Sequence, residues 1–174
     1  MQIQIFDSFR PEHEPLYAQI LNLAQTVSHT YPDYECWFRE KFMPGLRKKE
    51  RMYVVAQDNE GRVVGCVLIK KTTEEKKICT LFVDPKFRKQ GLGQQLMKRT
   101  LAVLGPRPLI TVSGRNLPQL AGLLDAFGFQ LSAVKKGVYR ADDAEYYFND
   151  PKADAVKNGL IPVLMQRMKQ LKHR

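Results

Sequence analysis

The order of apolar and polar residues predicts one strand and two helices at the start of the chain. Isoleucines that alternate with glutamines predict a strand over Met1–Phe6. Apolar residues spaced at threes and fours predict a helix over Pro11–His29. Pro32 should end that helix. A second helix is predicted over Asp33–Phe42, and Pro44-Gly45 should end it.

Three strands are predicted next. Met52–Ala56 and Arg62–Lys70 are separated by a polar turn signal, Asp58–Gly61, and should form a hairpin. The third strand, Lys77–Asp84, has apolar residues on both faces. A strand with two apolar faces is typical of the middle of a sheet that is covered on both sides.

The rest of the pattern alternates helices and strands. It predicts a helix, a strand, a helix ended by Gly128, and a closing hairpin, in the order Gln94–Leu104, Leu109–Val112, Asn116–Phe127, and then Phe129–Tyr139 with Glu145–Phe148. Hairpin strands therefore sit beside strands joined by a crossover helix. We expect an α/β (α+β) fold with a mixed, mostly antiparallel central sheet of about seven strands and helices on both faces.

Residues 149–174 are predicted to form a basic amphipathic helical tail outside a domain of residues 1–148. An apolar stripe in this tail opposes a face rich in lysine and arginine. One interpretation is that the stripe docks on its own domain or on a second copy of the chain, which would give a homodimer. The other is that the basic face contacts RNA or an acidic protein.

Composition limits the classes that remain. A chain of 174 residues fits one domain, and its net charge of +10 favours anionic partners. No nucleic-acid-binding motif accompanies that charge, so a nucleic-acid partner rests on charge alone. The longest uncharged apolar run, Val63–Ile69, is far shorter than a membrane span, and we expect neither a membrane partner nor a signal peptide.

The cysteines and histidines predict neither disulfides nor a metal site. Cys36, Cys66 and Cys79 are an odd number without a paired spacing, which favours a reducing, cytoplasmic location. They should be small buried hydrophobic residues. No Cys-x-x-Cys occurs and the three histidines are scattered, so no metal is expected.

The most informative segment is Val83–Gly93, which lies between a buried strand and a helix. Gly91 and Gly93 allow unusual backbone angles and a close approach to a ligand. The helix that follows directs its free N–H groups and its positive dipole end at the loop. Arg88 and Lys89 add positive charge. The segment therefore predicts an anion site shaped for a diphosphate.

Two other phosphate loops do not fit this segment. A P-loop requires Lys and then Ser or Thr at the helix start, whereas Gly93 is followed by Gln94. A dinucleotide-binding loop requires a third glycine three residues after Gly93, and none is present. A glycine-rich turn without a ligand stays open as the alternative.

The segment Leu81–Pro85 followed by Arg-x-x-Gly-x-Gly resembles the pyrophosphate loop of the GNAT superfamily of acyl-CoA-dependent N-acyltransferases. Val112–Asn116, an apolar helix and then Phe127–Phe129 resemble that family's next block. The resemblance covers residues 1–148 and leaves the tail outside.

The resemblance implies acetyl-CoA as co-substrate. Backbone N–H groups of the loop would hold the pyrophosphate, on Arg88, Lys89, Gln90, Gly91, Leu92, Gly93 and Gln94. The strand before the loop would pair its backbone with the pantetheine arm, like an added strand, through Leu81, Phe82 and Val83. Asn116 aligns with a family residue that often contacts this arm.

The reaction that the resemblance implies is direct attack of a primary amine on the thioester. A backbone N–H near Leu81 or Phe82 would polarise the carbonyl. The family's usual acid, a tyrosine, falls on Leu124, whose side chain has no acidic proton. Tyr139 on the last hairpin can replace it, water can protonate the thiolate, or catalysis is lost.

The general base and the acceptor stay open. Carboxylates can act as the base, and the candidates are Glu74, Glu75 and Glu145, each of which can equally be a solvated charge. Tyr31, Tyr34 and Trp37 either pack the first two helices together or line the acceptor pocket. The acceptor would be an amine on a small molecule, a peptide or RNA. The alternative to an enzyme is a CoA-binding sensor or scaffold without catalysis.

Overall fold

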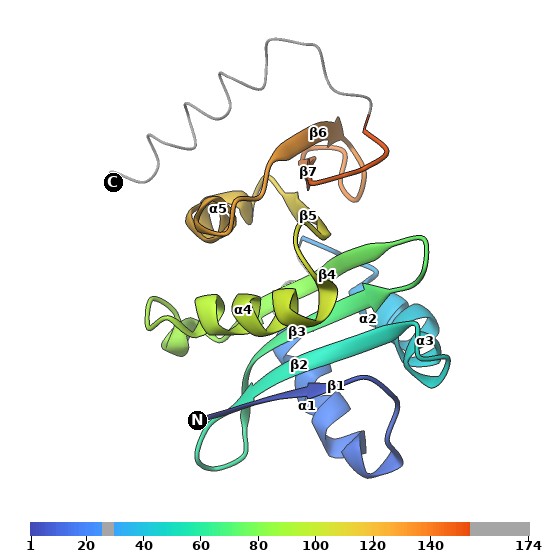
Figure 1. The fold of residues 1–174 in the computed structure, drawn as a ribbon, viewed down its shortest axis with the longest axis vertical. Helices are drawn as coiled ribbons and strands as arrows, with labels where there is room; N and C mark the ends of the chain where they lie inside the picture. Colours follow the sequence, from blue (N-terminus) through green and yellow to red (C-terminus); the bar gives the residue numbers. More distant parts are fainter. Residues whose placement is uncertain (26–29, 154–174) are drawn as a thin grey trace. The chain divides into compact units, whose positions relative to one another are not determined.

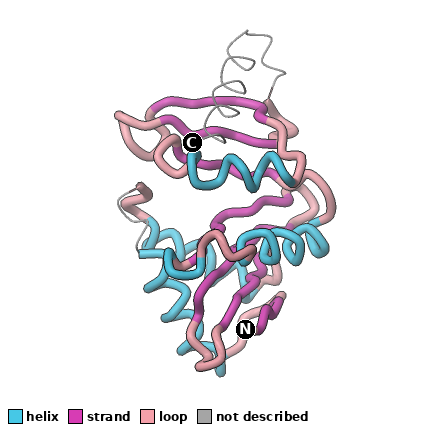
Figure 2. Tube along the Cα trace, turned by 90° about the vertical axis from the view of Figure 1, so that its left-hand side faces the viewer, coloured by secondary structure: helices cyan, strands magenta, loops and turns pink. Residues whose placement is uncertain are grey.

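The computed structural model describes residues 1–25 and 30–153, and it divides into two compact units, Met1–Pro108 and Leu109–Arg174. Figure 1 labels the helices and strands, and Figure 2 shows the same chain from the side. Each unit has its own strands and helices and is described separately. No helix among the described residues combines the length and the apolar character that crossing a membrane requires.

The first unit contains four antiparallel strands. They lie in sequence order, so that each strand pairs with the next: β1 (Gln2–Phe6), β2 (Arg51–Gln57), β3 (Val63–Lys71) and β4 (Lys76–Val83). These are the four predicted strands, with ends shifted by at most one residue. β3 is covered on both faces, and every residue from Val63 to Ile69 is buried. In β4 the two buried residues, Ile78 and Phe82, pair with Ile69 and Cys66 of β3 and so point to opposite faces, in agreement with the predicted cover on both sides.

Helical segments connect and cover these strands. They are the 3-10 helix η1 (Pro11–His13), α1 (Glu14–Gln25), α2 (Tyr34–Trp37), the π-helix η2 (Phe38–Phe42), α3 (Met43–Arg47), the 3-10 helix η3 (Pro85–Phe87) and α4 (Leu92–Leu104). The first predicted helix, Pro11–His29, is observed to Gln25, and residues 26–29 lie outside the described residues.

The prediction that Pro44-Gly45 ends the second helix was wrong, because α3 continues to Arg47. The N–H of Met43 bonds to the carbonyl of Phe38, five residues earlier, so the preceding turn is a π turn. Pro44 then lies in the first turn of α3, where a residue without an N–H costs little.

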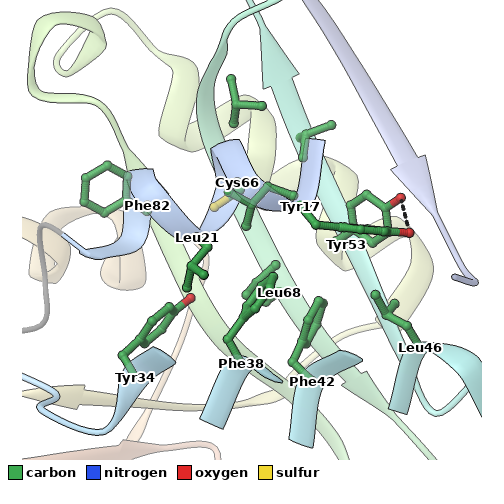
Figure 3. Packing of buried hydrophobic residues seen from close by; sticks show 13 residues of the cluster. Tyr17, Leu21, Tyr34, Phe38, Phe42, Leu46, Tyr53, Cys66, Leu68 and Phe82 are labelled. Carbon is green, nitrogen blue, oxygen red and sulfur yellow. Dashed lines mark hydrogen bonds between the residues drawn. The ribbon is translucent and has the colours of Figure 1, made fainter. Parts of the chain in front are cut away.

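One face of the first sheet packs against α1, α2, η2 and α3. Figure 3 shows rings from these helices directed at side chains that alternate along β2 and β3. Tyr53 of β2 donates from its hydroxyl to that of Tyr17 on α1 (3.4 Å), so the largest core residue also has a polar partner. The core of this face consists of Tyr17, Ile20, Leu21, Tyr34, Phe38, Phe42, Leu46, Tyr53, Val55, Val63, Cys66, Leu68 and Phe82.

The opposite face packs against α4, as Figure 1 shows. Leu92, Leu96 and Leu104 of α4 are almost fully buried. A Cβ on Gly65 of β3 would lie 3.0 Å from Cδ1 of Leu96 and 3.2 Å from the carbonyl oxygen of Phe82. The absence of a side chain at position 65 therefore lets α4 lie directly on the sheet.

The second unit contains three antiparallel strands and one helix. In chain order they are β5 (Leu109–Ser113), α5 (Leu117–Ala126), β6 (Leu131–Lys136) and β7 (Ala144–Phe148), with β7 paired to both β5 and β6. Gly128 follows α5 with a φ of +69°, as expected for a glycine that ends a helix.

The two units together confirm the predicted α+β class, with seven strands and mostly antiparallel pairing. The predicted tail, 149–174, falls largely on residues 154–174, which lie outside the described residues. The division into a domain of residues 1–148 and a tail stays a prediction.

We expect Gly65→Ala to destabilise the protein, because its methyl group would push α4 away from β3. Overpacking of this kind costs about 1–3 kcal/mol. Gly122→Ala is the matched control: position 122 lies on α5 with no atom within 4 Å of a built Cβ. It should be neutral or stabilising by up to about 1 kcal/mol. Denaturant unfolding measures both. Equal effects of the two substitutions would contradict the close packing of α4 against β3 at Gly65.

Candidate functional site

Hydrogen bonds of Asp84 fix the conformation of the loop between β4 and α4. The N–H of Asp84 donates to the carbonyl of Val64 on β3 (2.9 Å), which ties the loop to the end of the sheet. The Asp84 carboxylate accepts from the N–H of Lys86 (2.9 Å), and the carbonyl of Asp84 accepts from the N–H of Phe87 (2.8 Å). An aspartate before a proline commonly makes such a turn. Sequence reasoning did not single out Asp84, although the Asp-Pro pair was a usable signal.

Arg88 is directed back at the strand. Its Nε donates to the carbonyl of Val83 (2.9 Å), and its guanidinium carbon lies 5.6 Å from the centre of the Phe82 ring. The N–H of Arg88 donates to the carbonyl of Pro85 (3.3 Å). Of the seven amides predicted to hold a diphosphate, that of Arg88 is therefore engaged within the loop, and its side chain positions the loop.

The next residues turn the backbone into the helix. Lys89 and Gly91 both have left-handed angles, with φ of +59° and +80°. The bond from the N–H of Gln95 to the carbonyl of Gly91 (3.1 Å) is of the helical i to i−4 type. The N–H groups of the three residues before Gln95, Leu92–Gln94, therefore have no acceptor within the helix. A Cβ built on Gly91 meets no atom within 4 Å, so the backbone is open to a ligand there.

The charges around these amides are mostly positive. Lys86, Arg88 and Lys89 are exposed, and Asp84 is the only acid in the segment 84–94. The positive end of the α4 dipole adds to their field. Free N–H groups, a helix start and three cations in eleven residues form an arrangement that binds an anion with several oxygens.

β4 carries an irregularity four residues before its end. Leu68 pairs with Thr80 and Ile69 with Ile78, so Cys79 is an extra residue in the β3–β4 register. A bulge of this kind bends the strand and redirects side chains. The residues predicted to pair with a pantetheine arm follow Thr80 and pair with β3 in regular register; they are Leu81, Phe82 and Val83.

The three aromatic residues predicted for the acceptor wall pack together with the core. Tyr34 is 7% exposed, and its hydroxyl lies 3.2 Å from Oγ1 of Thr80. Its burial raises its pKa, so the phenol stays neutral. The Trp37 ring lies 5.5 Å from that of Tyr34, and Tyr31 is partly buried against the same cluster. Packing explains all three rings, and contact with an acceptor stays a prediction.

The candidates for proton transfer lie in different settings. Leu124, at the position of the family's usual tyrosine, is fully buried in α5. Tyr139 lies in the loop between β6 and β7 rather than on a strand and is 52% exposed. Among the carboxylates, Glu145 of β7 is 3% exposed, and Glu75 forms an ion pair with Lys70 (2.7 Å).

Two further residues predicted for the site, Glu74 and Asn116, form hydrogen bonds with residues close to them in the sequence. Glu74 accepts a hydrogen bond from the hydroxyl of Thr73, and this bond lowers the pKa of its carboxyl. Asn116 is the residue before α5, and its N–H donates to the carbonyl of Ser113 (3.0 Å). Its predicted role in contacting a pantetheine arm stays a prediction.

The cysteines are free thiols without a lowered pKa. Burial raises the pKa of Cys66 to about 12 and also raises that of Cys79. Cys36 is exposed, so the prediction of burial was wrong for it, and a hydrogen bond with Glu40 raises its pKa. Within the described part of the chain, no group of three or more His, Cys, Asp or Glu could hold a metal ion.

Comparison with known proteins identifies the domain. Residues 48–131 match the family model described as acetyltransferase (GNAT) domain. A search of the curated proteins finds no match. Among solved structures, the ribosomal-protein-S18-alanine N-acetyltransferase from Escherichia coli is 16% identical, with a TM-score of 0.65 over 84% of this chain and 92% of that one.

Two more solved structures share this fold. An aminoglycoside 6'-N-acetyltransferase complexed with coenzyme A is 16% identical, with a TM-score of 0.59 over 88% of this chain and 100% of that one. Ard1 from Thermoplasma volcanium is 22% identical, with a TM-score of 0.59 over 85% of this chain and 96% of that one. Residues 48–131 thus match a GNAT acetyltransferase domain, which confirms the resemblance found in the sequence.

We expect Cys36 to react first with a disulfide reagent, and Cys66 only on unfolding. A raised pKa leaves less thiolate at pH 8 than an ordinary thiol has. Glu40→Gln removes the cause of that rise, so it should increase the rate at Cys36, whereas Glu35→Gln on the same helix should not. Thiol release followed by absorbance measures these rates. Equal rates in both variants would contradict the assigned cause.

Proposed function

We propose that this chain transfers the acetyl group of acetyl-CoA directly to a primary amine. The observation that carries the proposal is the loop after β4, with Asp84 and Arg88 holding it to the sheet and the amides of Leu92–Gln94 lacking an acceptor within the helix. The match of residues 48–131 to the GNAT domain supports it. When bound, acetyl-CoA would supply an activated acetyl thioester.

The diphosphate would be held by backbone N–H groups of the loop and by its cations. The amides of Lys89–Gln94 fit this role, because the left-handed turns at Lys89 and Gly91 bring successive N–H groups to one place. Lys86 and Lys89 would supply positive charge at the rim. Arg88 would act mainly by fixing the loop, because its side chain is bonded to Val83.

The pantetheine arm would lie along β4. We take the extended pantetheine arm to span about five residues of β4, at about 3.3 Å per residue. Starting from Asp84, five residues reach Thr80 and the bulge at Cys79. The thioester would therefore lie beside Thr80, with Leu81, Phe82 and Val83 along the arm and Asn116 as a further contact.

Catalysis would come mainly from holding the two reactants together and from one hydrogen bond to the carbonyl. A backbone N–H near Leu81 or Phe82 would stabilise the developing negative charge. Tyr139 or water would protonate the departing thiolate. Glu74, Glu75 and Glu145 stay candidates for the group that takes the proton from the amine.

The acceptor is an amine whose carrier we propose only by class. Two of the structural neighbours are named for their acceptors, an aminoglycoside and an alanine of a ribosomal protein. A small molecule or a peptide is thus in keeping with the fold. An RNA-borne amine remains a further class, on the net charge of +10 alone. Three free thiols suit a reducing location such as the cytoplasm.

A second candidate function is binding of CoA without transfer. It is favoured by Leu124, because a buried leucine occupies the place of the family's usual proton donor. The two candidates share the CoA site and differ only in turnover.

We expect Gly91→Asp to weaken binding of acetyl-CoA by at least about tenfold, because a carboxylate would face the diphosphate. Gly91→Asn is the matched control: it has nearly the same size, and asparagine tolerates the left-handed angle at Gly91 without adding a charge. Isothermal titration calorimetry measures both. Equal losses in the two variants, or no saturable binding by the original protein, would remove the proposed site.

Release of free CoA thiol from acetyl-CoA, measured with panels of amines and peptides, separates the two candidate functions. The transferase proposal predicts release above background with at least one acceptor and its loss in Gly91→Asp. Binding without release across the panels would instead favour the sensor or scaffold.

A further inference from the structure

Three cations lie in one row across the first sheet. Arg51 of β2 pairs in register with Lys70 of β3, and Lys70 pairs with Lys77 of β4. Residues directly opposite each other in antiparallel strands point to the same face, with Cβ atoms about 5 Å apart. Like charges in such positions destabilise a sheet. The row therefore requires compensation by negative charge.

The chain supplies only part of that compensation. Glu75 forms an ion pair with Lys70, at 2.7 Å. Within residues 1–25 and 30–153, no salt bridge joins Arg51 or Lys77 to an acid. Glu35, an acid on α2 two residues before Trp37, is paired with Arg39. Three positive charges thus face one carboxylate.

The row is partly buried, unlike the lysines beside it. Arg51, Lys70 and Lys77 are all of intermediate exposure. The next register pair, Lys71 and Lys76, is exposed. Adjacent residues in a strand point to opposite faces, so the two sets lie on different faces. If Arg51, Lys70 and Lys77 were an ordinary solvated row, they would be as exposed as Lys71 and Lys76. Their lower exposure therefore distinguishes them from that pair.

The side chain of Arg51, at one end of the row, has several defined contacts. A Cβ on Gly45 of α3 would lie 2.6 Å from its Cδ, so the helix leaves room for this side chain. Its guanidinium carbon lies 5.5 Å from the centre of the Trp37 ring, and Nη1 donates to Sγ of Cys79 (3.4 Å). The guanidinium therefore reaches across β3 to the bulge of β4.

The geometry points to a carboxylate-binding site formed by Arg51, Lys70 and Lys77 beside Trp37, which selects an acceptor amine that also carries a carboxylate. This inference rests on the proposed function, because the bulge at Cys79 is where the thioester would lie. A planar guanidinium suits a carboxylate, which it can bind through two parallel hydrogen bonds.

The same charges disfavour other acceptors. An excess of positive charge repels polyamines and other polycationic amines. It also lowers the pKa of a nearby ammonium group, so more of the acceptor would be the neutral amine that attacks the thioester. Attraction of the carboxylate and deprotonation of the amine would therefore come from one row.

The test uses Trp37, the only tryptophan of the chain, as a reporter that needs no activity. Its fluorescence is followed while glycine or glycinamide is added at constant ionic strength, and calorimetry is run in parallel. The peptide amides Ala-Glu-Ala and Ala-Gln-Ala form a second pair. We expect saturable binding of the carboxylate member of each pair and at least about fivefold weaker binding of the member that lacks the carboxylate. Binding of glycine indicates a free amino acid, and binding of the glutamate peptide alone indicates a peptide acceptor.

Matched variants locate the effect. Lys77→Gln should weaken binding of the carboxylate by about fivefold. Lys76→Gln, the adjacent residue on the opposite face, should leave it unchanged. Equal binding of the probes with and without a carboxylate, no binding of any probe by either method, or equal effects of the two variants would overturn the proposal. Acetyl-CoA binding is measured separately, so loss of the CoA site and loss of this site give different results.

Discussion

The site depends on how tightly the loop after β4 is fixed to the sheet. The N–H of Asp84 bonds to Val64, and Nε of Arg88 bonds to Val83, so two backbone carbonyls at the strand ends hold the loop. Gly65 lets α4 lie against the same strands. An anion site made of backbone N–H groups has little affinity unless those groups are held in place, because ordering them on binding would cost conformational entropy. The packing of the core thus positions the amides.

Much of the fold was predictable from the sequence, because the spacing of apolar residues and the turn residues between the elements were clear. Alternation predicted β1, and the turn at Asp58–Gly61 predicted the β2–β3 hairpin. The family resemblance followed from Arg88, Gly91 and Gly93 in their spacing, and the GNAT domain confirms it. The residues of the candidate site were named on the same basis, and their roles are proposals.

Other features depend on contacts that a single sequence does not encode locally. The helix passes Pro44 because a π turn at Phe38–Phe42 shifts its hydrogen bonds. The bulge at Cys79 arises from the pairing of two strands, and no residue in that segment is of a type that predicts a bulge. Cys36 is exposed although free cysteines are mostly buried, because its helix turns it away from the core. None of these three features follows from the average preference of a residue type. The row of Arg51, Lys70 and Lys77 likewise becomes visible only from the strand register.

The central claim is that backbone amides at the start of α4 hold the diphosphate of CoA. A crystal structure of the protein with CoA bound tests it most directly. It should place diphosphate oxygens within hydrogen-bonding distance of the N–H groups of Gly91–Gln94, with the arm running along β4 toward Thr80. A diphosphate bound elsewhere on the protein, with these amides occupied by the chain's own side chains, would contradict the claim.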